Sequence, residues 1–155
     1  MIRKFAYLVV TMALTSALYA QQVPPTAPRD HDIYCAGSVT MTPPPQDTYV
    51  ISGVESAIRI LFNQGDLVFI NRGSKQGVQV GAEFLVSREV KERSATSWFA
   101  WQKDLMRAMG ATYADIGRIR VVHVDANTST AQIALFCEPM QRGDIVRPFV
   151  ARTAP

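Results

Sequence analysis

The segment from Gly65 to Val90 constrains the fold more than any other part of the chain, because it joins two apolar runs through closely spaced glycines. The run Leu67–Ile70 is continuously apolar, which is typical of a strand buried on both faces, so we predict a strand from Asp66 to Asn71. A second strand is predicted from Ala82 to Val90. Glycine at high density serves positive φ angles or close backbone approach. We therefore predict one corner of a small β-barrel, turned by Gly73, Gly77 and Gly81.

These glycines do not match the patterns of phosphate-binding loops. A Walker loop requires GxxxxGK followed by Ser or Thr, and a dinucleotide turn requires GxGxxG at the start of a helix. In this chain the glycine-rich stretch leads into a predicted strand instead. We assign Gly77 and Gly81 to turn geometry rather than to ligand binding.

A second corner repeats the first near the end of the chain. Gly65 and Asp66 precede Leu-Val, and Gly143 and Asp144 precede Ile-Val. We interpret the two pairs as equivalent corners of one sheet, in which the aspartate side chain caps the turn. The adhesion tripeptide spelled by Arg142-Gly143-Asp144 is then a chance reading.

Three further segments predict strands. Tyr49–Ile51 is a short candidate, and Ile116–Asp125 alternates in the manner of a strand before a turn and a second hairpin strand, Thr130–Cys137. His123 falls on the first hairpin strand and is expected at the barrel surface, not as a catalytic base. The segment Ser52–Phe62 is ambiguous between a capped helix and a strand, and its β-like neighbours favour a strand.

One segment changes to helical periodicity. Apolar residues at spacings of three and four, N-cap candidates before them and Gly110 after them predict a helix over about residues 96–109. Two interpretations of its aromatic face stay open: the rings cover an open end of the barrel as core, which we favour, or they form a surface for a protein or a glycan. The candidate partner surface comprises Trp98, Phe99, Trp101, Leu105 and Met109.

The N-terminus predicts export. A basic start is followed by an uncharged apolar run, Phe5–Leu18, and by small residues, which together indicate a signal peptide over residues 1–20 with cleavage after Ala20. The alternative is a retained membrane anchor, but the run is shorter than the roughly 20 residues that cross a bilayer. We expect a periplasmic or extracellular protein without a stable membrane span.

Removal of the signal peptide leaves a nearly neutral chain. Residues 21–155 carry 14 basic and 13 acidic side chains. Their one basic cluster, Arg88–Arg93, is interrupted by Glu89 and Glu92. Neither a nucleic-acid surface nor a polybasic membrane patch is predicted.

Cys35 and Cys137 are the only cysteines, and in an exported protein such a pair predicts a disulfide. Two alternatives have less support: lipidation of Cys35, which lacks a small-residue lipobox, and a reactive thiol, which lacks a histidine pattern. The bridge is expected to tie the N-terminal arm to the last third of the chain.

The domain organisation follows from proline content and length. We predict a proline-rich extended arm over residues 21–47, one barrel domain over 48–150 and a tail over 151–155. Asp30-His31-Asp32 lies in the arm without further ligands nearby, so we expect no metal site there and no cofactor.

The two corners and the strands between them resemble the C-terminal domain of the bacterial flagellar assembly protein T and related small β-barrel domains of exported envelope proteins. The shared pattern is glycine-aspartate, an apolar strand, a glycine turn with Gly77 and Gly81, a second strand and a final glycine-aspartate strand, over Gly65–Phe149. The resemblance implies a small β-barrel, and this chain departs from the family by inserting the helix predicted at about residues 96–109. We therefore expect a mainly β fold, a barrel of about five to seven strands with one inserted helix.

Two functional hypotheses remain. The first is a non-catalytic envelope module that binds a protein partner or peptidoglycan through a barrel edge or the inserted helix. The second is a small periplasmic hydrolase whose site is assembled from scattered residues such as Asp104, Asp115 and His123. A concave pocket in which His123 meets a carboxylate would favour the enzyme.

Overall fold

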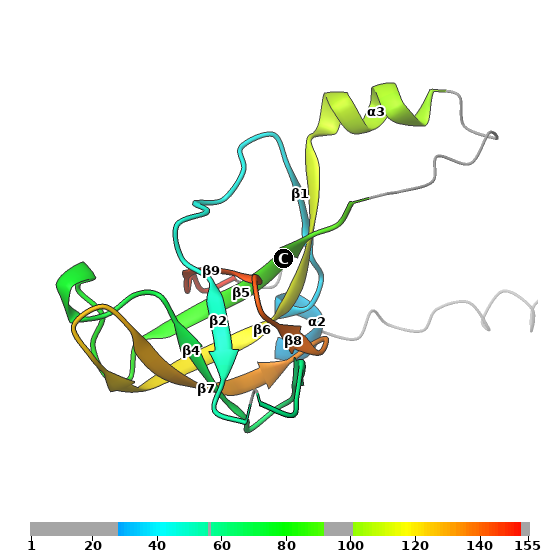
Figure 1. Ribbon diagram of the computed structural model, residues 1–155. Coiled ribbons are helices and arrows are strands. Elements are labelled where there is room, and N and C mark those ends of the chain that lie inside the picture. The colour runs from blue at the N-terminus through cyan, green and yellow to red at the C-terminus, as the bar shows by residue number, and fades with distance from the viewer. Residues whose placement is uncertain (1–27, 56, 92–100, 153–155) are drawn as a thin grey trace, which may run out of the picture.

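The computed structural model describes residues 28–55, 57–91 and 101–152 and shows a mainly β protein, with 44% strand and 12% helix. Its main sheet curls into a half-barrel, which confirms the predicted small β-barrel-like fold (Figure 1). Neighbouring strands are antiparallel, in the order β2 (Val50–Gly53), β4 (Leu67–Ile70), β7 (Ser129–Phe136), β6 (Ala111–Val124), β5 (Glu83–Glu89) and β9 (Ile145–Pro148).

The two edge strands of this sheet meet at one end. Tyr49 and Ile145 form a single antiparallel bridge, and the Val50 amide donates to the carbonyl of Asp144 at 3.0 Å. Two short strands, β3 (Leu61–Phe62) and β8 (Met140–Gln141), pair with each other outside the main sheet. The curled sheet thereby wraps around its apolar face.

The core consists of the inward-facing side chains of these strands. Phe62 of β3 and Met140 of β8, 1% and 0% exposed, join side chains from β2, β4, β5, β6, β7 and β9. The principal members are Val50, Phe62, Val68, Ile70, Val86, Ile116, Ile119, Val121, Ile133, Met140 and Val146. Nearly all of these side chains come from strands. The exception among the described residues is Val78, which lies in the glycine-rich turn before β5 (Glu83–Glu89), and no member of the cluster comes from a helix.

The N-terminal arm is more ordered than predicted. Residues 30–40 contain a short helix, α2 (Asp30–Tyr34), and a strand, β1 (Ser38–Thr40), which pairs with the start of β6. The extended arm predicted over 21–47 is therefore wrong for this part. Its order comes from tertiary contacts that proline counting does not detect, chiefly the disulfide of Cys35 with Cys137 and the burial of Tyr34 against the ring of Phe149.

The ambiguous segment before β3 is mostly a loop. Only its ends belong to strands, β2 and β3, and the amides of Ile58 and Arg59 both donate to the carbonyl of Glu55 at 3.2 Å. The strand predicted through Ile58 and Ile60 is thus wrong, because a local turn satisfies the backbone there. The glycine-rich turn contains a 3₁₀ turn, η1 (Ser74–Gln76).

The remaining helix, α3 (Gln102–Met109), begins later than predicted. Residues 96–100 of the predicted helix lie outside the described part of the chain, and with them Trp98 and Phe99. The C-terminal end of α3 agrees with the prediction, since Gly110 follows it with φ +101° and leads directly into β6.

Candidate functional site

The two predicted corners share one geometry. Gly65 and Gly143 have φ angles of +88° and +86°, and the aspartate after each glycine accepts a hydrogen bond from the backbone amide three residues earlier at 2.8 Å. The glycine amide donates to a strand carbonyl, that of Ile133 at the first corner and of Val50 at the second, both at 2.9 Å. Gly77 and Gly81 have φ angles of +80° and +87°, a backbone conformation that favours glycine.

The corners differ in burial. The Asp144 side chain is 1% exposed and receives a bidentate contact from Arg88, at 2.7 and 2.9 Å. The hydrogen bond to Asp144 raises the pKa of Arg88 above its usual value, against the lowering effect of burial. The Asp66 side chain is 29% exposed and contacts Arg59 only at 3.3 to 3.4 Å. Because Asp144 is buried and bound, the Arg-Gly-Asp tripeptide does not present its carboxylate to a receptor.

The residues of the hydrolase hypothesis are not brought together. Asp104 lies on α3, with its side chain 75% exposed and paired with Arg107 at 3.0 Å. Asp115 and His123 lie eight positions apart on β6, roughly 26 Å along an extended strand. His123 is a surface strand residue as predicted, because a register shift after Val121 turns it outward; its side chain is 67% exposed and faces Asp125 at 3.4 Å.

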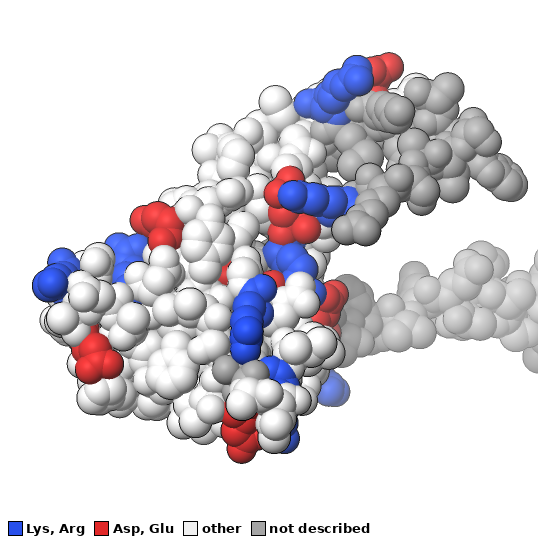
Figure 2. Space-filling view, viewed as in Figure 1, with Lys and Arg blue, Asp and Glu red and all other residues white. Residues whose placement is uncertain are grey.

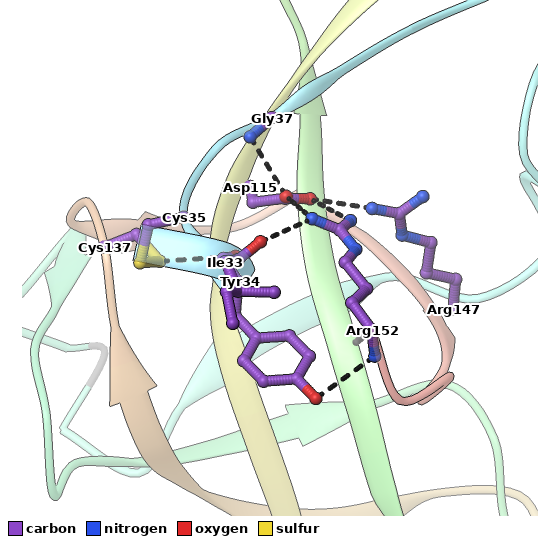
Figure 3. Close-up of a disulfide and its surroundings, with 8 residues drawn as sticks. All are labelled: Ile33, Tyr34, Cys35, Gly37, Asp115, Cys137, Arg147 and Arg152. Atoms are coloured by element: carbon purple, nitrogen blue, oxygen red, sulfur yellow. Dashed lines mark hydrogen bonds and ion pairs between the residues drawn. A yellow bond between two sulfur atoms is a disulfide. The ribbon is translucent and has the colours of Figure 1, made fainter. Parts of the chain in front are cut away.

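Asp115 instead links separate segments of the chain (Figure 3). Its side chain is 0% exposed and accepts from Arg147 and Arg152, both at 2.7 Å. The amide of Gly37 donates to the same carboxylate at 3.1 Å, and Arg152 also donates to the carbonyl of Ile33 at 3.0 Å. This carboxylate is occupied in holding α2, β6, β9 and the C-terminal segment together. Arg152 therefore belongs structurally to the barrel rather than to a tail.

The disulfide lies beside this cluster, with the Cα atoms of Cys35 and Cys137 5.5 Å apart (Figure 3). It confirms the predicted pairing. The guanidinium of Arg118 lies over the rings of Tyr34 and Phe149, at 5.6 and 5.2 Å from their centroids. The disulfide and these stacked groups fix α2 to the outer surface of the barrel.

A three-stranded β-extension, which we call the arm and which differs from the predicted N-terminal arm, projects from the barrel and carries α3 at its end (Figure 1). It is formed where the start of β6 pairs with β1 on one side and with the end of β5 on the other. Gly110 connects α3 to β6. Only glycine fits at this position, because a Cβ would collide with the backbone of Thr40 and Met41. Met41 therefore lies beside the C-terminal end of the helix.

The apolar row of α3 faces solvent. Trp101, Leu105 and Met109 follow at intervals of four, so they share one side of the helix, yet they are 60%, 45% and 53% exposed. The interpretation that we favoured, a helix covering an open end of the barrel as core, is wrong for these three residues. The physical reason is that the core is already built from other side chains, nearly all of them on strands, and no residue of α3 belongs to it.

Two further exposed apolar residues lie on β1 and directly after it, near the C-terminal end of α3. Val39 is 49% exposed and Met41 67% exposed. A groove of about 510 Å³ lies at the base of the arm, between β1, the start of β6 and the disulfide. We call Leu105, Met109, Val39 and Met41, with Trp101, the arm surface. The sequence did not identify Val39 and Met41, because a short strand beside a proline cluster carries no periodic signal.

Charges of both signs are interspersed on the face shown in Figure 2, as expected for a nearly neutral chain. Among the described residues, no group of three or more His, Cys, Asp or Glu could hold a metal ion. None of the described helices is long and apolar enough to cross a bilayer.

The fold and the arm surface together define a small disulfide-bonded β-barrel domain that carries an exposed amphipathic helix. No protein-family model, no curated protein and no solved structure matches the chain. The similarity to flagellar assembly protein T remains a prediction from the corner pattern.

Proposed function

We propose that this chain is a non-catalytic, exported module of the cell envelope that binds a protein partner through the arm surface. The observation that carries the proposal is α3 itself, a helix of eight residues whose apolar side chains Leu105 and Met109 are 45% and 53% exposed. Isolated helices shorter than about 12 to 15 residues are marginal in water. A partner that buries this row would supply the packing that such a helix needs.

The pattern of the row fits one recognised mode of binding. An amphipathic helix docks into an apolar groove through side chains at i and i+4, here Leu105 and Met109. Full burial of each side chain contributes about 1.5 to 3 kcal/mol. Aliphatic side chains of this kind suit a protein groove better than peptidoglycan, whose sugars are bound by stacking and by hydrogen-bond donors.

Export is supported by two independent features. The first 20 residues have the pattern of a signal peptide, and the chain contains a disulfide. Disulfides persist in oxidising compartments and are rare in the cytosol. The periplasm or the cell exterior is therefore the proposed location.

The test is crosslinking in living cells with a photoreactive amino acid at Ala108, an exposed position next to the row. The wild-type surface should capture a defined protein, and Leu105→Asp/Met109→Asp should abolish the product. The control Asp104→Asn/Arg107→Gln removes the exposed ion pair of the same helix, present at 3.0 Å, and should leave the product intact. The free energy of unfolding of both variants should lie within about 0.5 kcal/mol of the wild-type value, because the substituted side chains are exposed. The proposal would be refuted if the two variants gave the same crosslinked products, or if the wild-type protein were crosslinked to peptidoglycan and to no protein.

A further inference from the structure

The loop between β2 and β3 presents a second apolar surface, distinct from the arm surface. Ile58 and Ile60 are 86% and 76% exposed, and Val54 and Leu61 at the ends of the loop are 56% and 45% exposed. Isolated exposed apolar residues are ordinary, but a run of large ones at a single tip indicates an interaction site. We call these four residues the loop tip.

Arg59 holds the loop tip in this orientation. Its guanidinium contacts the carboxylates of Glu55 and Asp66, each at 3.3 Å. It also lines the hollow of about 200 Å³ between the loop and the first barrel corner, whereas Ile58 and Ile60 do not. The charged side chain is thus turned toward the protein and the two apolar neighbours away from it, the reverse of the arrangement expected for an ordinary surface loop.

We infer that the loop tip inserts into the apolar region of a phospholipid leaflet and so holds the exported module at a membrane surface. The inference rests on the proposed export of the chain. Three properties favour lipid over a protein. Ile58 and Ile60 protrude with few protein contacts, so a protein would need a dedicated pocket whereas lipid adapts to any shape. The four side chains also expose well under the roughly 800 Å² per partner of a standard protein interface.

The third property is the polar content of the loop. The amides of Ile58 and Arg59 are bonded within the loop, to the Glu55 carbonyl, so entry into an apolar layer does not expose them unpaired. The one cation, Arg59, is paired with two carboxylates. Binding should therefore depend on apolar insertion and not on anionic headgroups.

The test is flotation with vesicles of pure phosphatidylcholine, using the chain from Gln21 onward, which keeps the whole described fold and lacks the apolar N-terminal segment. Wild type should float with the vesicles and should still do so in about 1 M salt, where surface charges are screened. Ile58→Ser/Ile60→Ser should lower the partition coefficient about tenfold or more. The control Val80→Ser/Val122→Ser removes two exposed apolar side chains elsewhere, 67% and 44% exposed, and should bind as wild type does.

The proposed function and this inference can fail separately. Leu105→Asp/Met109→Asp should float as wild type does, even though it loses its protein partner. The inference is overturned if wild type does not float, if the control variant loses binding equally, or if flotation requires anionic lipid and disappears in salt. It is also overturned if Ile58→Ser/Ile60→Ser abolishes a dimer of the free protein and leaves flotation unchanged.

Discussion

The two glycine-aspartate corners supply a matched pair of sites for testing how burial sets the contribution of a carboxylate. We compare Asp144→Asn with Asp66→Asn. Both substitutions keep an oxygen that accepts the backbone hydrogen bond within the turn, present at 2.8 Å in each corner. The substitutions therefore share the loss of a charge and differ in what surrounds it.

The expected difference follows from the arginine partners. After Asp144→Asn, the guanidinium of Arg88 faces a neutral amide. The Arg88 side chain is 30% exposed, and the side chain at position 144 is 1% exposed. Removal of one partner of a buried ion pair costs about 3 to 5 kcal/mol, and the partial exposure of Arg88 places this case near the lower limit. Asp66→Asn breaks an ion pair with 46% exposed Arg59 and should cost about 1 kcal/mol or less. We expect the free energies of unfolding to differ by about 2 kcal/mol or more.

Urea unfolding of the oxidised protein, followed by tyrosine and tryptophan fluorescence, measures this difference if the slopes of the transitions agree. The pKa of Arg88 is raised in the folded state. The contribution of its charge to the free energy of unfolding is therefore complete below the pKa of the unfolded state and is lost only as pH rises through the pKa of the folded state. The cost of Asp144→Asn should consequently be constant between about pH 7 and pH 10. Equal costs for the two substitutions would contradict the reasoning, since they would show that the turn and not the buried pair determines stability.

Two other experiments, one on the disulfide and one on the glycines, test separate parts of the barrel. Reduction of the Cys35–Cys137 disulfide, which spans 102 residues, should lower the free energy of unfolding by about 4 to 5 kcal/mol. The measurement compares urea unfolding in the presence and in the absence of dithiothreitol. The free energy of unfolding of the control Cys35→Ser/Cys137→Ser should not change with the reductant. Gly117→Ala should cost more than about 2 kcal/mol, because φ is +154° and a Cβ would strike the Leu135 carbonyl. Gly81→Ala, with φ +87° and open space around the Cβ, should cost less by the same assay.

The sequence was sufficient to predict most of the strands. β4, β5, β7 and β9 lie within or beside the segments predicted for them, because a strand buried on its core face must carry apolar residues there. The corners were equally predictable, since a turn that requires positive φ selects glycine. The segment before β3 was not, because the alternation of Ile58 and Ile60 has the period of a strand but belongs to a loop whose apolar side chains face solvent.

The candidate site was predictable only in part, for a reason that applies to any amphipathic helix. Periodicity shows that Trp101, Leu105 and Met109 share a face, but it does not show what covers that face. Coverage depends on whether the core has room, and the barrel interior is filled by side chains from strands distant in sequence. The same limit hid Asp115, whose two arginine partners come from β9 and from the C-terminal segment. Surfaces that remain exposed after the core is complete, the arm surface and the loop tip, are therefore where partners of this protein should be sought.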